Sequence, residues 1–180
     1  EYTGLDNELE ASVASVAGVI EKTIAWVNDH QDWANMHDLT VIGYGNNYAT
    51  AMEGSLKLLE TMSIASMFID IEEFSHGTHR AMHKDSRIVL LASDSEGKED
   101  TRVTAKYLQN VSDYVLLVDA GSDAKEDELT LVLPCMKETE SSLLLVVVIQ
   151  VLSVAFPELL DKDPNYPYNQ DLTTIIKTRV

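Results

Sequence analysis

Five short runs rich in Val, Ile and Leu constrain the fold of this chain more than any other feature. Helical patterns lie between them at about 48–62 and 98–111, and a long apolar stretch starts near residue 138. Nearly continuous apolar strands that alternate with helices are typical of a parallel sheet covered on both faces. The pattern therefore predicts an α/β fold, a three-layer α-β-α sandwich with a five-stranded, mostly parallel sheet. The five predicted strands are 39–44 (LTVIGY), 64–70 (IASMFID), 87–93 (RIVLLAS), 113–120 (DYVLLVDA) and 128–134 (ELTLVLP).

The two ends of the chain lie outside this alternation. Residues 7–29 have the pattern of an amphipathic helix, for which Asp6 is a suitable N-cap. Residues 161–180 begin with a Pro- and Asn-rich stretch that we expect to run over the surface. We therefore expect an N-terminal linker helix over 1–35, one domain over 36–160 and a C-terminal tail over 161–180. The apolar positions of the first helix are Leu9, Val13, Val16, Ile20, Ile24 and Val27.

Residues 142–156 (SLLLVVVIQVLSVAF) form the most apolar segment of the chain. A helix that crosses a bilayer needs about 20 apolar residues, and this run of 15 has acidic residues on both sides. We expect a helix buried in the core or in a subunit interface, and no membrane partner.

The charge balance limits the partners further. The chain has 13 Lys and Arg against 30 Asp and Glu, a formal net charge of −17. Nucleic acids and anionic membranes are bound by basic patches, so the composition argues against both classes of partner. A single cysteine, Cys135, excludes a disulfide framework and favours a reducing compartment, the cytoplasm. We interpret Cys135 as an inert buried thiol.

The turn after the first predicted strand, 43–47 (GYGNN), lies where α/β folds bind ligands. The backbone N–H groups at the start of the next helix can hold an anion there. Gly45, Asn46 and Asn47 are the candidate contacts. The same glycines also suit a plain strand-to-helix turn, so this feature alone leaves both interpretations open.

The helix that follows carries Glu53, Lys57 and Glu60 at steps of four and three residues, which places all three on one face. Such a stripe is often only a solvated set of ion pairs. Here the nearby turn and the apolar residues Met52, Leu56 and Leu59, which we expect to form the neighbouring packing face, favour a functional site. After the second strand, the segment 72–77 (EEFSHG) places His76 16 residues beyond Glu60.

Together, GYGNNYATAMEGSLKLLE and EEFSHG resemble the second sugar-isomerase (SIS) subdomain of glucosamine-6-phosphate synthase and of the related fructosamine-type 6-phosphate deglycases. The shared pattern is E-G-x-x-K-x-x-E on a helix followed by an E-x-x-H-G turn, and the resemblance covers about 36–160. It implies that Glu60 is the general base that moves a proton between C1 and C2 of an open-chain sugar phosphate. It also implies that His76, often contributed by the neighbouring subunit, opens the sugar ring.

The resemblance assigns substrate-positioning roles to Glu53 and Lys57, and Lys177 is the candidate for the family's lysine near the C-terminus. A proton shift next to a carbonyl does need a carboxylate within hydrogen-bond reach of the carbon acid, and a separate group at the ring oxygen. Lys177 lies three residues beyond the counted position of that family lysine, where this chain has Thr174. The G-P that commonly follows the family histidine is Gly77-Thr78 here.

The phosphate loop of a first SIS subdomain, S-x-S-G-x-T, has only a degenerate counterpart at 93–101 (SDSEGKEDT). Its acidic residues Glu96, Glu99 and Asp100 would repel a phosphate. Because a second subdomain shows this degeneration, the resemblance implies a first SIS half of the same protein as a partner. It also implies a homodimer or higher oligomer, so that this chain carries half of an active site.

The predicted function is therefore that of a phosphosugar-binding SIS domain of a sugar-phosphate isomerase, aminotransferase or deglycase. Its implied substrate is an amino-sugar or fructosamine 6-phosphate. The alternative is a module that senses a sugar phosphate or assembles subunits without catalysis. His76, His79 and His83 follow H-x₂-H-x₃-H, but Gly77 interrupts the helix they would need. We interpret them as surface histidines and expect neither a metal nor a cofactor.

Overall fold

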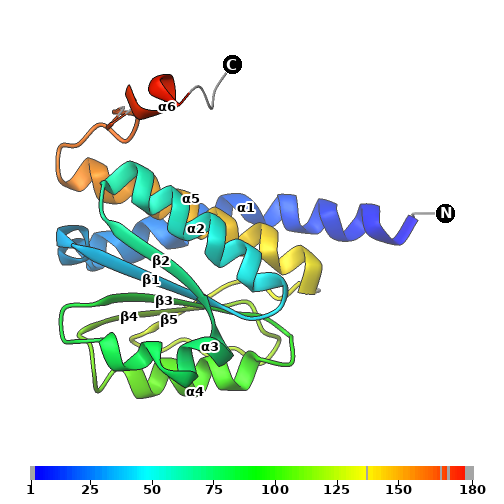
Figure 1. Cartoon of the computed structure of the whole chain (residues 1–180). Coiled ribbons are helices and arrows are strands. Elements are labelled where there is room, and N and C mark those ends of the chain that lie inside the picture. The colour runs from blue at the N-terminus through cyan, green and yellow to red at the C-terminus, as the bar shows by residue number, and fades with distance from the viewer. Residues whose placement is uncertain (1–2, 137, 167, 170, 177–180) are drawn as a thin grey trace.

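Five parallel strands form one sheet in the order β2-β1-β3-β4-β5 (Figure 1). The structure, a computed structural model, describes residues 3–136, 138–166, 168–169 and 171–176. Each predicted strand is present, and the predicted α/β sandwich is confirmed. The strands are β1 (Asp38–Gly43), β2 (Ala65–Asp70), β3 (Arg87–Ala92), β4 (Tyr114–Asp119) and β5 (Thr130–Val132).

Helices cover both faces of the sheet. Figure 1 shows α1, α2 and α5 in one layer and α3 and α4 in the layer on the opposite face, with α6 away from the sheet. Short 3₁₀ turns, η1 (Gln31–Asn35) and η2 (Thr78–Ala81), precede β1 and β3. The helices are α1 (Thr3–Asp29), α2 (Asn46–Met62), α3 (Ile71–His76), α4 (Lys98–Leu108), α5 (Glu138–Leu159) and α6 (Asp171–Ile175).

The core is divided between the two faces by the two-residue period of the strands. In β3, Val89 and Leu91 pack against the layer of α1, α2 and α5, whereas Ile88 and Leu90 pack against the layer of α3 and α4. All four side chains are buried. This is why β3 reads as a continuous apolar run: both of its faces are covered.

Helix α5 lies at the centre of its layer, against α1 and α2. Its stretch Glu140–Leu159 is long and apolar enough to cross a membrane by length and composition. The inner side chains of that stretch are nevertheless part of the core, as the core helix of a globular domain requires. The prediction of a helix packed in the core is confirmed. The buried side chains are Leu144, Leu145, Val148, Ile149, Leu152 and Phe156.

The predicted apolar face of α1 packs on the core only in part: Val27 is buried in the core and Val16 packs against it. The structure buries Ser12, Val19 and Thr23, which lie beside that face, whereas Leu9, Val13 and Ile24 are exposed. The apolar stripe of α1 lines a groove between α1 and α5, so that the part of it farthest from the core is left uncovered. The groove has a volume of about 560 Å³, and its walls are mainly aliphatic.

Candidate functional site

The three charged residues of α2 lie together on its outer face. Lys57 Nζ is 3.0 Å from Glu60 Oε2 and 3.9 Å from Glu53 Oε1, and the three side chains are between 36% and 47% exposed. The hydrogen bond to Glu60, with the charges of both glutamates, raises the pKa of Lys57 despite some desolvation. The lysine is therefore a cation held between two carboxylates that solvent can reach.

The apolar neighbours of this stripe differ from expectation. Met52, Leu56 and Leu59 were expected to form the packing face of α2, but they are exposed. The buried side of the helix instead includes Gly54 and Leu58, and a Cβ at Gly54 would lie 3.0 Å from the Ile149 side chain of α5. Close packing of α2 on α5 leaves a surface where an apolar stripe and a charged stripe run side by side.

The glycines of the turn before α2 are required by the backbone geometry of the turn itself. Gly45 has φ 56°, in the region that favours glycine, and a Cβ at Gly43 would lie 2.4 Å from the Asn47 carbonyl oxygen. Asn47 is buried, and its Nδ2 donates to Ser93 Oγ at 2.9 Å, which ties the turn to the end of β3. Asn46 is exposed at the start of the helix. Of the three predicted contacts, Gly45 and Asn46 face solvent and Asn47 holds the loops together.

His76 lies far from Glu60 within one chain. Glu60 is near the end of α2, about 21 Å along the helix from Asn46 at about 1.5 Å per residue, and therefore near the amino end of the sheet. His76 ends α3, which begins directly after β2 at the carboxyl end of the sheet and packs on the opposite face. The structure thus brings Glu53, Lys57 and Glu60 together but does not bring His76 to them. Lys177 lies outside the described residues.

No metal site is found among the parts of the chain that the structure describes, which include all three histidines. Helix α3 ends at His76, and Gly77 separates it from η2. The Nδ1 atom of His79 lies 3.2 Å from the Phe74 carbonyl oxygen, and His83 lies 3.7 Å from an Asp38 carboxylate oxygen. The three histidines do not share one face.

Comparison with known proteins decides the family. A family model described as SIS domain matches residues 34–155, more than half of the chain. The chain belongs to the SIS family. The resemblance seen in the sequence is thereby confirmed at the level of the family.

Relatives of this SIS chain are larger proteins. Glutamine–fructose-6-phosphate aminotransferase (isomerizing) from Idiomarina loihiensis is 27% identical over 169 residues, which cover 92% of this chain and 26% of that protein. Among solved structures, a candidate phosphosugar isomerase from Clostridium difficile 630 aligns with a TM-score of 0.86 and 23% identity, over 99% of this chain and 50% of that one. The C-terminal domain of glucosamine-fructose-6-phosphate aminotransferase from Francisella tularensis aligns with a TM-score of 0.76 and 19% identity, over 89% and 46%. The SIS chain thus spans about a quarter of the length of this curated relative and about half of these two solved chains.

The loop that resembles an SIS phosphate loop is closed in this chain. Ser93 is buried and accepts the hydrogen bond from Asn47, while Thr101 Oγ1 donates to the Gly97 carbonyl oxygen at 2.8 Å. A Cβ at Gly97 would lie 2.4 Å from the Tyr44 ring, so the ring rests directly on the loop. The hydroxyls of Ser93 and Thr101 therefore make their hydrogen bonds inside the fold.

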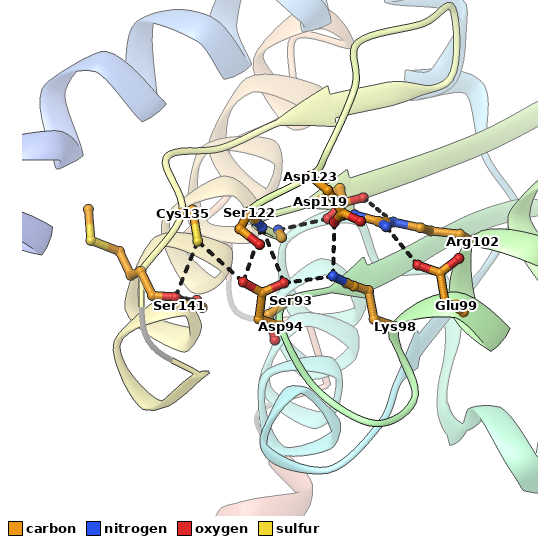
Figure 2. Close-up of polar contacts among 12 residues, drawn as sticks. Ser93, Asp94, Lys98, Glu99, Arg102, Asp119, Ser122, Asp123, Cys135 and Ser141 are labelled. Atoms are coloured by element: carbon orange, nitrogen blue, oxygen red, sulfur yellow. Dashed lines mark hydrogen bonds and ion pairs between the residues drawn. The ribbon is translucent and has the colours of Figure 1, made fainter.

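A second charged cluster, which sequence reasoning missed, joins this loop to the ends of β4 and β5 (Figure 2). We call it the strand-end network. Arg102 donates through Nε to Asp119 Oδ2 at 2.7 Å and through Nη2 to Asp123 Oδ1 at 2.9 Å. Lys98 Nζ donates to Asp94 Oδ1 at 2.8 Å and to Asp123 Oδ1 at 2.9 Å.

Cys135 belongs to the same network and is exposed, so the prediction of a buried thiol is wrong. The loop after β5 carries it beside Asp94, and its Sγ lies 3.5 Å from Asp94 Oδ2. Desolvation, together with the hydrogen bond to Asp94, raises the pKa of the Cys135 thiol. A thiol with a raised pKa is a weaker nucleophile at neutral pH, and the inertness of Cys135 stays a prediction.

Proposed function

We propose that this SIS domain binds a phosphorylated sugar on the outer face of α2 and takes part in a proton transfer between C1 and C2. The observation that carries the proposal is the placement of Glu60: an accessible carboxylate, hydrogen-bonded to a protonated lysine, at the edge of an exposed apolar stripe. Membership of the SIS family supports it.

The reaction suits this chemistry. The carboxylate of Glu60 removes a proton from the carbon next to the carbonyl group, and the electron pair of that C–H bond forms the double bond of an enediol. The carbonyl oxygen takes up a proton, while the hydroxyl on the deprotonated carbon loses one and becomes the new carbonyl group. The protonated Glu60 returns its own proton to the former carbonyl carbon, so that no net charge is left on the sugar. A positioned general base contributes about 10²- to 10⁴-fold to such a step. Lys57 stays protonated between the carboxylates and offsets their charge near the substrate.

The groups that open the sugar ring and hold its phosphate are not found beside Glu60 among the described residues of one chain. His76, the proposed ring-opening group, would reach a substrate on α2 only from a second subunit, because within one chain it lies at the other end of the sheet. The sugar's phosphate would be held by a first SIS half. Glu53 and Lys57, beside Glu60, are the proposed substrate contacts, and Lys177 stays a prediction. The predicted contacts Gly45 and Asn46 lie at the other end of α2, and Asn47 is buried, so these three do not reach a sugar held at Glu60 in the same chain.

The substrate class we favour is an amino-sugar or fructosamine 6-phosphate. The supporting observation is that several curated relatives carry the name glutamine–fructose-6-phosphate aminotransferase. Aminotransferase, isomerase and deglycase activities share the proton transfer proposed for Glu60. A cytoplasmic location and an oligomer stay predictions.

The exposed apolar residues Met52, Leu56 and Leu59 favour a second candidate, an assembly or sensing module without catalysis. Such a module needs an apolar contact surface beside the charged stripe but no proton transfer. Catalytic turnover therefore separates the two functions.

Replacement of Glu60 tests the proposal in the full-length protein that carries this domain. We expect Glu60→Gln to lower turnover of the sugar phosphate by at least about 100-fold, with binding of the sugar phosphate retained within about threefold. The matched control is Glu128→Gln, an exposed glutamate in the loop before β5. Unchanged turnover in Glu60→Gln would refute the catalytic proposal, and bound sugar phosphate without turnover in the unmodified protein would favour the second candidate.

A further inference from the structure

The side chain of Asp94 is held as a bound anion would be. It lies in the loop after β3, and its Oδ1 accepts from Lys98 Nζ at 2.8 Å. The backbone N–H of Ser122, in the loop after β4, lies 3.2 Å from both carboxylate oxygens. Cys135, in the loop after β5, offers its thiol at 3.5 Å from Oδ2. Figure 2 shows these groups converging on one carboxylate.

We call the groups that hold the Asp94 carboxylate, from Lys98, Ser122 and Cys135, the anion cradle. The cradle lies where α/β folds bind ligands. The loops after β3, β4 and β5 all lie at the carboxyl edge of the parallel sheet, where crevices for ligands form. A backbone N–H and an ammonium group aimed at one point make an anion-binding concavity. Here the anion comes from the chain itself.

The charges around the cradle oppose a second anion. Lys98 is shared with Asp123, and Arg102 is shared among Asp119, Asp123 and Glu99. The strand-end network therefore holds two cations among four carboxylates, Asp94 included. A free phosphate would have to displace the Asp94 carboxylate from its donors while standing next to Asp123.

We propose that Asp94 is a built-in anion, a side-chain carboxylate that fills the cradle made by Lys98, Ser122 and Cys135 and so excludes free phosphate from this edge of the sheet. Asp94 is then a residue that sets specificity by blocking. This inference rests on the proposed function in one respect: a bound sugar phosphate would have to place its phosphate away from the carboxyl ends of β3, β4 and β5.

The test uses inorganic phosphate and is therefore independent of any sugar chemistry. Phosphate is titrated into the chain at constant ionic strength, and the dissociation constant is read from the ¹⁵N–¹H shifts of the Ser122 amide. We expect no saturable shift in the unmodified chain. In Asp94→Ser, which empties the cradle, we expect phosphate to bind with a dissociation constant at least about tenfold below the highest phosphate concentration tested on the unmodified chain. We expect the further change Lys98→Met to abolish that binding.

The matched control is Asp113→Ser, which removes an exposed carboxylate from the opposite edge of the sheet, where it pairs with Lys84. We expect no gain of phosphate binding from it, because net charge alone changes there. A folded Asp94→Ser chain that binds phosphate no better than the unmodified chain would overturn the proposal. So would an equal gain in Asp113→Ser.

The unmodified chain keeps the proposal falsifiable if Asp94→Ser does not fold. A saturable phosphate-dependent shift of the Ser122 amide in that chain, absent in sodium chloride of equal ionic strength, would show that Asp94 does not block the cradle. Absence of that shift, with the Ser122 amide observed, is the expected result.

Discussion

The two charged clusters of this chain both pair carboxylates with cations, but they differ in how far water reaches them. The stripe on α2 consists of three side chains within two turns of one helix, and each of them is more than a third exposed. The strand-end network joins three loops, and its central members are withdrawn from water: Lys98 and Arg102 are 18% exposed and Asp119 is 2% exposed. Exposed pairs contribute little to stability, whereas removing one partner of a buried pair is costly. The stripe is therefore free to serve a ligand, and the network is committed to holding loops.

The largest effect on stability should come from Arg102. In Arg102→Met the buried Asp119 loses its cation. We therefore expect the free energy of unfolding, measured in urea, to fall by about 3 kcal/mol. The control in the open cluster is Lys57→Met, for which we expect a loss below about 1 kcal/mol because its ion pairs are exposed. Equal losses in the two variants would remove the distinction between the clusters.

Packing of the closed loop should give the next largest effect. In Gly97→Ala the new methyl group would meet Tyr44 at its Cβ, Cγ and Cδ1. These atoms are close to the Tyr44 backbone and cannot rotate out of the way. We expect the free energy of unfolding to fall by about 2 kcal/mol. Gly18→Ala is the control, since a Cβ at this position in α1 meets nothing within 4 Å. In Gly18→Ala we expect the free energy of unfolding to rise by about 0.5–1 kcal/mol, because alanine has a higher helix propensity than glycine. Thermal unfolding of both variants checks this, and a Gly97→Ala chain as stable as the unmodified one would mean that the loop is open.

Acid should weaken the network by a smaller amount. The hydrogen bond from Lys98, reinforced by Ser122 and Cys135, lowers the pKa of Asp94 to about 2. Because the folded pKa lies below the unfolded value of 3.8, this stability is present above about pH 4 and is lost as the pH falls toward 2. After allowance for the partial exposure of Asp94, we expect its share to be about 1 kcal/mol. Asp94→Asn should flatten the stability profile between pH 4 and 2 by that amount, and an unchanged slope would contradict the assignment.

The sequence predicted the fold well because the relevant signals are local. A buried parallel strand needs apolar side chains on both faces, so β3 and β4 stand out as continuous runs. The stripe of Glu53, Lys57 and Glu60 follows from helical spacing alone. The predicted apolar face of α1 is only partly buried, because the position of α5 decides which residues of that helix are covered.

The strand-end network could not be predicted in the same way. Its contacts join residues far apart in sequence, such as Asp94 with Ser122 and with Cys135, and they form only because β3, β4 and β5 are neighbours in the sheet. Periodicity carries no information about such meetings between loops. The distance between Glu60 and His76 has the same origin: their spacing in the sequence matches the family pattern, but the strand between them takes the chain to the other end of the sheet.

We infer that the open stripe on α2, and not the strand-end network, carries chemistry. The most direct test is exchange of the C1 proton of fructose 6-phosphate with deuterium oxide, followed by ¹H NMR in the full-length protein at a temperature where all variants are folded. We expect Glu60→Gln to lower the exchange rate at least about 100-fold. We expect Asp123→Asn, in the strand-end network, to leave that rate within about threefold of the unmodified protein. Exchange that survives in Glu60→Gln and is lost in Asp123→Asn would show that the network, and not the stripe, carries the chemistry.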